Sequence, residues 1–573
     1  MNLAQVVFDS QGVRLHGSLH AAEPPGAPAF VFCHPLFEER KSACRAMAEA
    51  ADAFCRRGFS VLRFDYRGCG DSGGAFADFA VGDWEQDIVA ALEFVRTSCA
   101  PRAVGLAGLR LGAALALRVA AHRDDVAWAL LWEPVVNGRV HLGQELRKKL
   151  TKEMVTFGKT RVTRASLFEQ LEQGQSIDFD GYPLSARLYR ELVELDLGTA
   201  APHGGLRCLV AAVTPTGTPS PEASELSGQL AATACASEAA GVRLQPFWNL
   251  VGYVHTGELA TVSLDWLARQ KNARPAPAST RGPAPAPPGG PDHERAPETA
   301  VTFPCDGRLL RGILGMPEGA APRAGIVFLH GWSGCRLGPH RMFVSLSRRL
   351  VAAGFACLRF DVAGRGESDG QAGAATIETM THDACAAAEW MKTRHGTDRV
   401  VLLGICSGAK VAIATAEALP GIRHLVLWSA EAMGDLRNAA TRARRSLGAL
   451  KAYARKLVSP RTWRKLLSGR VNVGLVGKAI AQTETPDLNE RAAESRVLHG
   501  FRRFPGEILF LYGSRDPDTS SAAQRYLEFC RRWGVANTMH EIPDANHSFY
   551  GLEWEQRVFD LTAAWLDEHV PGR

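Results

Sequence analysis

The sequence lacks the features that would place it in several special classes of protein. No uncharged apolar run approaches the ~18 residues that a membrane-spanning helix needs. The first twenty residues contain no basic stretch followed by an apolar one, so we expect no secretory signal. The 13 cysteines are odd in number and form no CxxC pair, which argues against a disulfide framework and a zinc ribbon. These absences predict a cytoplasmic protein.

Recognition patterns for metals, phosphates and nucleic acids are also missing. No group of metal ligands stands at a familiar spacing, and the glycine-containing loop at 364–370 lacks the GK[ST] of a phosphate-binding loop. The aromatic and base-reading patterns of nucleic-acid-binding domains are absent as well. We therefore expect no metal, no cofactor and no nucleic-acid partner.

The composition that remains is that of a large globular protein with one unusual segment. The chain has 573 residues, of which 46% are hydrophobic and 22% charged, enough for two large domains. Residues 271–299 hold eight of the 31 prolines and almost no large apolar side chain. Such a segment cannot form a core and favours extended polyproline II. We predict a linker at 271–299 between domains at 1–270 and 300–573.

The two sides of this linker repeat each other. A constant shift of 296 residues carries His34 onto His330, Asp65 onto Asp361 and the segment GLRLG at 108–112 onto GICSG. Such a shift indicates duplicated domains. In both copies, short apolar runs rich in β-branched residues alternate with stretches of helical periodicity. The sequence predicts an α/β fold in each half, with a mainly parallel sheet flanked by helices.

The second half carries the pattern of a nucleophile elbow. The segment VVLLGICSGAKVAIATAEAL predicts a strand, a tight turn and a helix, with Gly404 and Gly408 on either side of Cys406. The central residue of such a turn is strained and tolerates only small neighbours. The N-terminus of the following helix favours a thiolate. Ser407 is the rival nucleophile, but it stands off the centre of the turn. A buried, inert core cysteine is the structural alternative.

Two further residues complete a catalytic pattern. Asp516 follows an apolar strand, and His547 lies in a loop after another strand. This order of nucleophile, acid and histidine resembles the α/β-hydrolase superfamily, and the cysteine resembles the dienelactone hydrolase variation on it. The resemblance implies that Cys406 attacks a carbonyl carbon, that His547 is general base and then acid, and that Asp516 orients the imidazole. Asp518 is a second candidate for the acid.

An oxyanion hole is expected beside this triad. The segment FLHGWSG follows the first strand of the parallel sheet of the second half. We predict that the backbone N–H groups of Trp332 and Ser407 bind the oxygen of a tetrahedral intermediate.

The first half has lost the same pattern. Arg110 stands at the nucleophile position and offers no nucleophilic lone pair at any usable pH. Pro35 follows His34 where the second copy has glycine, and no aspartate occurs between Leu197 and Leu264. We expect a non-catalytic scaffold domain. The alternative is a ligand site in which Arg110 and His34 bind an anionic group.

A finer resemblance covers most of both halves. The run HPLFEERKSACRAMAEAADAFCRRGF and the elbow GLRLGAALAL resemble one of two hydrolase families associated with exosortase systems. The elbow GICSGA and the run YARKLVSPRTWRKLLSGRVNV resemble the other. The resemblance implies a fusion of two serine aminopeptidase-like α/β-hydrolases in a bacterial exopolysaccharide setting. It implies no particular reaction.

A basic helical cap is predicted at about 430–500. Residues 436–470 contain 11 Lys or Arg and no acidic residue, whereas the whole chain carries a net charge of only +6. An apolar stripe at helical spacing runs along the segment: Leu436, Ala440, Ala443, Leu447, Leu450, Ala454 and Leu457. The stripe either packs over the active site with the charges in solvent, or it contacts an anionic membrane surface or polymer.

These patterns predict hydrolysis of a small-molecule ester or thioester through an acyl-enzyme in the second half. One alternative is an acyltransferase that uses the same triad. Another is a non-enzymatic assembly factor for surface-polymer export.

Overall fold

The structure is a computed structural model that describes residues 2–23, 25–158, 160, 162–233, 235–250, 252–270, 298–319, 321–395, 397–436, 488–516 and 519–572. It forms two compact units, Met1–Val400 with Ser548–Arg573 and Val401–His547. Nearly all of the predicted linker lies outside the described residues, as do 437–487 of the predicted cap. The domain boundaries therefore stay predictions.

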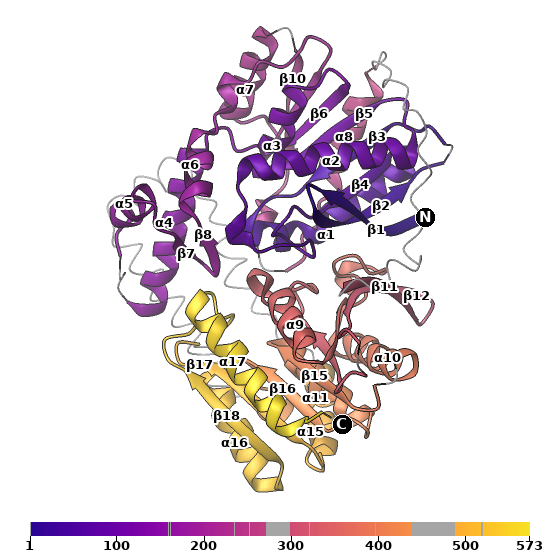
Figure 1. Ribbon diagram of the computed structural model, residues 1–573, viewed down its shortest axis with the longest axis vertical. Coiled ribbons are helices and arrows are strands. Elements are labelled where there is room, and N and C mark those ends of the chain that lie inside the picture. The colour runs from indigo at the N-terminus through magenta and orange to yellow at the C-terminus, as the bar shows by residue number, and fades with distance from the viewer. Residues whose placement is uncertain are drawn as a thin grey trace. The chain divides into compact units, whose positions relative to one another are not determined.

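The first half is built on an eight-stranded sheet in the order β1-β2-β4-β3-β5-β6-β9-β10 (Figure 1). The pairs β1–β2 and β2–β4 are antiparallel and the other neighbours are parallel. The strands are β1 (Asn2–Ser10), β2 (Val13–Ala21), β3 (Ala29–Cys33), β4 (Ser60–Phe64), β5 (Val104–Leu109), β6 (Val126–Trp132), β9 (Arg207–Thr214) and β10 (Ala236–Arg243). The central strands, such as AFVFC in β3, are buried along their whole length because helices cover both faces.

Two groups of helices supply those covers. On one face α1 (Phe37–Arg56) and α8 (Gly257–Ala268) pack with Phe30, Phe32 and Trp132 in one core. On the other face α2 (Val81–Cys99), α3 (Leu111–Ala121) and α7 (Pro221–Ala232) pack with Val31 and Leu106 in a second core. Between β6 and β9 lies a cap of α4 (Gly138–Phe157), α5 (Arg164–Glu172), α6 (Ala186–Glu194) and the hairpin of β7 (Ile177–Phe179) with β8 (Tyr182–Leu184).

The second half repeats this sheet with the order β11-β12-β14-β13-β15-β16-β17-β18. Its strands are β11 (Glu298–Cys305), β12 (Arg308–Gly315), β13 (Gly325–Leu329), β14 (Ala356–Asp361), β15 (Val400–Ile405), β16 (His424–Trp428), β17 (Glu507–Gly513) and β18 (Ala536–Ile542). Its helices are α9 (Met342–Ala352), α10 (Ile377–His395), α11 (Ser407–Ala418), α15 (Leu488–Phe501), α16 (Ser520–Trp533) and α17 (Leu552–His569). The predicted fold class, two tandem α/β-hydrolase folds with mainly parallel sheets, is confirmed.

Within the larger unit, residues of the two halves meet through buried ion pairs. Arg63 donates to Glu367 Oε1 at 2.7 Å, and Arg359 donates to Asp71 Oδ1 at 2.6 Å. The shift of 296 residues carries Arg63 onto Arg359 and Asp71 onto Glu367. The two contacts are therefore copies of one another, as in the interface of a symmetric dimer, where each contact occurs twice.

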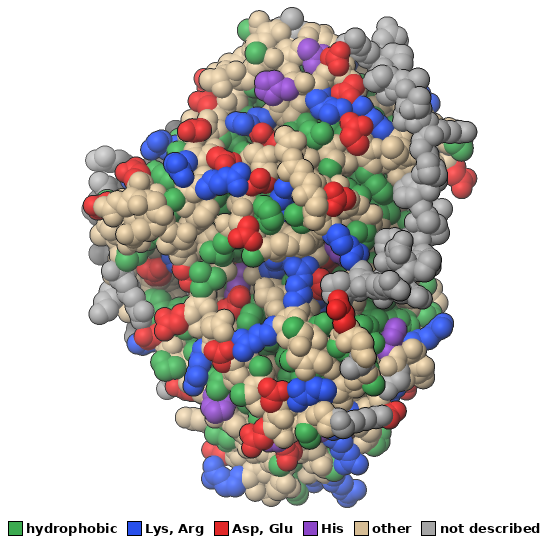
Figure 2. Space-filling model, viewed as in Figure 1, with side chains coloured by type: hydrophobic (Ala, Val, Ile, Leu, Met, Phe, Trp, Pro, Cys, Tyr) green, Lys and Arg blue, Asp and Glu red, His purple; other side chains and the backbone are tan. Residues whose placement is uncertain are grey.

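No helix among the described residues is both long and apolar enough to cross a membrane. On the face drawn in Figure 2, Lys and Arg side chains lie among Asp and Glu throughout the described part. The predicted basic segment at 436–470 lies outside the described residues except for Leu436, so its contact with an anionic surface stays a prediction.

Candidate active site

Cys406 lies at a sharp turn between β15 and α11. Its backbone has φ 59° and ψ −124°, a conformation that costs a residue with a side chain about 1–3 kcal/mol. The turn closes tightly, because a Cβ on Gly404 would lie 2.4 Å from the carbonyl oxygen of Gly408. The structure thus has the elbow that the glycine spacing predicts, with Cys406 at its centre and Ser407 buried in the first turn of the helix.

His547 and Asp516 form a hydrogen-bonded pair. Nδ1 of His547 lies 2.7 Å from Oδ2 of Asp516, and the Asp516 side chain is fully buried. Asp516 follows β17, and Thr519 donates its hydroxyl to the same carboxylate oxygen. Because Nδ1 is engaged by Asp516, Nε2 remains for Cys406, with which His547 also forms a hydrogen bond. The three residues of the predicted triad thus lie together, whereas Asp518 is not among the described residues.

A glutamate that the sequence did not single out also contacts the thiol. Glu431, just after β16, places Oε1 3.4 Å from Sγ of Cys406. Its other oxygen lies 3.0 Å from Nζ of Lys410, which is buried one turn into α11 and also lies 3.5 Å from Oε1 of Glu494. The only sequence signal is that Glu431 follows a strand of the parallel sheet, and the carboxyl ends of such strands share one edge.

The charges around Cys406 favour a protonated imidazole and an ionised glutamate. Burial lowers the pKa of His547, but hydrogen bonds to Asp516 and Cys406 and the negative charges of both raise it to about 11. Burial raises the pKa of Glu431, but the charge and hydrogen bond of Lys410 lower it to about 2. At neutral pH the imidazolium of His547 and the carboxylate of Glu431 therefore both lie next to the Cys406 sulfur. The donor atoms of Cys406, Glu431 and His547 lie within 4.8 Å of one another, so the same three groups could also hold a metal ion.

The residues predicted for the oxyanion hole lie at the expected ends of their elements. Trp332 follows β13, its indole N–H donates to the Ala375 carbonyl at 2.9 Å, and the Arg365 guanidinium stacks 4.9 Å from its ring. Trp332 and Ser407 belong to different compact units. Their joint role in binding an oxyanion stays a prediction.

The first-half elbow has the same backbone and a different side chain. Arg110 between β5 and α3 has φ 57° and ψ −121°, close to the values at Cys406. Its guanidinium lies 3.4 Å from Glu39 Oε1 and 5.2 Å from the ring centre of Trp248. The place of a nucleophile is thus taken by a cation beside the carboxyl group of Glu39, whose pKa burial raises to about 7.

His34 follows β3 beside the first-half elbow, since a Cβ on Gly112 would lie 2.4 Å from its carbonyl oxygen. It is buried, and burial holds its pKa well below the ordinary value, so the ring is neutral. It borders a small cavity with Arg40, Arg63 and Asp65, which Arg110 does not line. The alternative in which Arg110 and His34 bind an anionic group stays a prediction.

Comparisons with known proteins agree with the fold of each half. Residues 21–178 match the family described as serine aminopeptidase, S33, and residues 326–561 match the alpha/beta hydrolase family. The lysophosphatidylserine lipases ABHD12 of Macaca fascicularis and Mus musculus are 37% identical over 93 residues, 16% of this chain and 22% of each lipase. The chain thus matches only about a fifth of the length of these curated relatives.

Solved structures cover one half of the chain at a time. The esterase Est1E from Butyrivibrio proteoclasticus, solved with ferulic acid bound, is 17% identical, covers 47% of this chain and 99% of its own, and has a TM-score of 0.34. A dienelactone hydrolase from Anabaena variabilis is 17% identical, covers 48% and 97%, and has a TM-score of 0.32. With both family matches placed on the duplicated sheets, the chain carries two α/β-hydrolase domains, one in each half.

Proposed function

We propose that the second half hydrolyses a carboxylic ester or thioester through a covalent acyl-enzyme on Cys406. The observation that carries the proposal is the pair of His547 and Asp516 at 2.7 Å, with the elbow cysteine hydrogen-bonded to the same imidazole. The match of residues 326–561 to the alpha/beta hydrolase family and the lipase names of the partial relatives support an ester-type substrate.

Acylation would begin from a thiolate beside an imidazolium. The sulfur of Cys406 attacks the carbonyl carbon, and the carbonyl electron pair moves to oxygen to give a tetrahedral oxyanion. Collapse expels the alkoxide or thiolate of the leaving group, which takes the proton from Nε2 of His547. Asp516 keeps the other ring nitrogen protonated and stabilises the positive charge.

Deacylation would reverse the proton flow. The neutral imidazole removes a proton from water as the water oxygen attacks the thioester carbon. The second tetrahedral intermediate then expels the Cys406 thiolate and releases the carboxylic acid. Whenever the sulfur carries its proton, the thiol donates a hydrogen bond to Glu431 Oε1 at 3.4 Å.

The test is a panel of p-nitrophenyl esters and acyl-CoA thioesters assayed with the full chain. We expect turnover that disappears in Cys406→Ala, falls by a factor on the order of 10³ or more in His547→Ala, and survives in Arg110→Ala. Adding an alcohol and analysing the products separates hydrolysis from acyl transfer. Full turnover in Cys406→Ala, or its loss in folded Arg110→Ala, would place the chemistry elsewhere.

We further propose that the first half serves as a non-catalytic scaffold and that the protein acts in the cytoplasm. Arg110 at the place of a nucleophile supports the former, and 13 free cysteines support the latter. A role in exopolysaccharide or exosortase systems, as an enzyme or as an assembly factor, rests on the sequence resemblance alone.

A further inference from the structure

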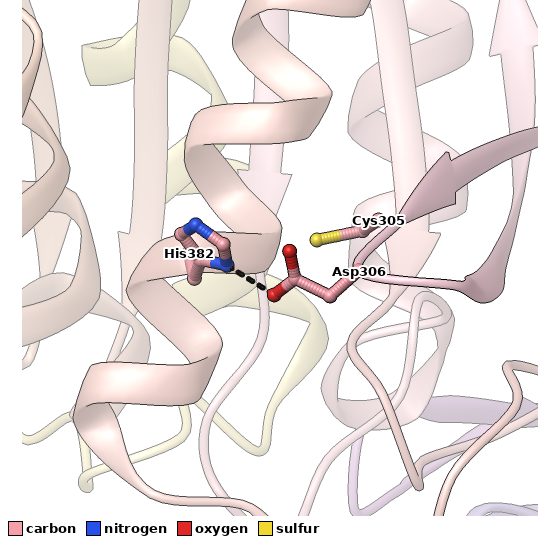
Figure 3. A group of neighbouring side chains, drawn as sticks. All are labelled: Cys305, Asp306 and His382. Carbon is pink, nitrogen blue, oxygen red and sulfur yellow. Dashed lines mark ion pairs between the residues drawn. The ribbon is translucent and has the colours of Figure 1, made fainter.

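A second group of potential ligands lies outside the candidate active site. Cys305 at the end of β11, Asp306 in the following turn and His382 on α10 converge in Figure 3. Their donor atoms all lie within 4.8 Å of one another, and Nδ1 of His382 is 2.6 Å from Oδ2 of Asp306. Cys305 is buried, whereas the Asp306 and His382 side chains are more than half exposed. Ions in solvent can therefore reach the donor atoms of Asp306 and His382.

In the first half, the guanidinium of Arg67 lies at the position that corresponds to this group. There, Arg67 donates from Nε to Asp87 Oδ1 at 2.7 Å, and its other nitrogens reach Ser10 Oγ at 2.6 Å and Gln11 Oε1 at 3.2 Å. Ser10 ends β1 and Gln11 begins the turn to β2, as Cys305 ends β11 and Asp306 begins the turn to β12. A buried cation thus joins this turn to the helix that carries Asp87.

The second half keeps the carboxylate, at Asp383, and has Ala363 where the first half has Arg67. The backbone N–H of Ala363 donates to Asp383 Oδ2 at 2.7 Å, as the N–H of Arg67 donates to Asp87 Oδ2 at 2.8 Å. Alanine brings no charge, and Asp383 is only 1% exposed with no hydrogen bond of normal geometry at Oδ1. The Cys305 thiol interacts with this carboxylate.

Three of the four replacements at this position introduce side chains that can bind a metal ion. Serine, two glutamines and arginine in the first half become Cys305, Asp306, His382 and Ala363 in the second, with Gln86 at the place of His382. We propose that Cys305, Asp306 and His382 bind a divalent transition-metal ion, with zinc the best match, at the position that the Arg67 guanidinium fills in the first half. Thiolate, imidazole and carboxylate are the usual ligands of zinc, and water would complete the tetrahedron.

The geometry requires only small movements. Ligand atoms of a tetrahedral zinc site stand about 3.3–3.6 Å apart, given metal–ligand bonds of about 2.0–2.3 Å. The exposed Asp306 and His382 side chains therefore need to separate by about 1 Å. Arg308 is the competing cation, because one guanidinium nitrogen lies 3.6 Å from both Asp306 Oδ2 and Asp383 Oδ1. It is partly exposed and can swing into solvent when the metal binds.

The test is Co²⁺ binding to the full-length protein after removal of metal with a chelator. We use Cys406→Ser as the background, because Cys406, Glu431 and His547 form the other cysteine-containing group among the described residues. One equivalent of Co²⁺ should produce a thiolate-to-cobalt charge-transfer band, and added Zn²⁺ should remove it. Cys305→Ser and His382→Ala should weaken binding at least about 100-fold, more than the loss of an outer-shell partner. Cys385→Ser, on the same helix, should not.

Two further variants use the comparison between the halves. Ala363→Arg restores the first-half cation, so it should abolish Co²⁺ binding while the protein stays folded. Arg308→Ala removes the competing cation, so it should leave binding unchanged or tighten it. No band in the background protein, or a band that survives in both Cys305→Ser and His382→Ala, would overturn the proposal. Because His382 is exposed, its variant should fold even if the cysteine variant does not.

Discussion

At the scale of single residues, Cys406 differs from the other 12 cysteines by its surroundings. Only its thiol combines an elbow, a hydrogen bond to a histidine and a nearby carboxylate among the described residues. We predict that iodoacetamide alkylates Cys406 first, because the thiolate is the reacting species. Mass spectrometry of the digested protein measures the order of labelling. Cys55→Ser should leave the rate unchanged, whereas equal labelling of several cysteines would contradict the assignment.

The raised pKa of His547 gives a second prediction at this scale. The folded value of about 11 lies above the ordinary 6.5, so the stabilisation is complete below pH 6.5 and is lost as pH rises toward 11. The difference in free energy of unfolding between the wild type and His547→Gln should therefore be largest below pH 6.5 and shrink in alkali. NMR titration of His547 should show a lower pKa in Asp516→Asn. A difference that grows with pH would contradict the ion pairing.

At the scale of elements, the sequence predicted those features that depend on local patterns. Apolar runs predicted the central parallel strands, and the spacing of Gly404 and Gly408 predicted the elbow. Each of these patterns depends only on the burial and backbone conformation of the residues that form it. Glu431, Lys410 and the Cys305 group could not be predicted in this way. Their contacts depend on which strand ends and helices become neighbours, and Cys305 and His382 are 77 positions apart in the chain.

The two elbows allow a matched test of what the turn contributes. A Cβ at Gly404 would lie 2.4 Å from the Gly408 oxygen, and a Cβ at Gly108 would lie 2.4 Å from the Gly112 oxygen. Gly404→Ala and Gly108→Ala should each cost about 1–3 kcal/mol of stability through overpacking. Only Gly404→Ala should also lower turnover, measured at a temperature where both variants are folded. Equal loss of turnover would mean that the first elbow takes part in the reaction.

At the scale of the whole molecule, the duplication explains both what was lost and what was kept. The first half has Arg110 where the second has Cys406, and its Arg63 and Asp71 pair with Glu367 and Arg359 of the second half. All four side chains are at most 5% exposed. Glu367, the counterpart of Asp71, places its carboxylate on Arg63. The first half thus contributes buried ion pairs to the second.

The ion pairs between the halves and the Pro-rich segment lead to opposite predictions about whether the halves fold independently. A linker at 271–299 suggests halves that fold independently, but residues 300–573 expressed alone would leave Glu367 and Arg359 without their partners. Removing one member of a buried pair costs about 3–5 kcal/mol, a large part of the stability of a domain. We therefore predict that the isolated second half is unstable and regains solubility when residues 1–270 are co-expressed.

A double-mutant cycle tests whether the ion pair of Arg63 and Glu367 stabilises the protein. In the full chain, Arg63→Met and Glu367→Gln should each destabilise by several kcal/mol, because each leaves a buried partner charged or unsatisfied. The double variant should cost less than the sum of the two, since neither charge remains, and denaturant unfolding measures the difference. Additive losses, together with a stable isolated second half, would show that the two halves depend on one another only through the linker. The reciprocal pair Arg359 and Asp71 should also be coupled, but more weakly, because Glu298 remains a partner of Arg359 and Arg336 a partner of Asp71 when the pair is broken.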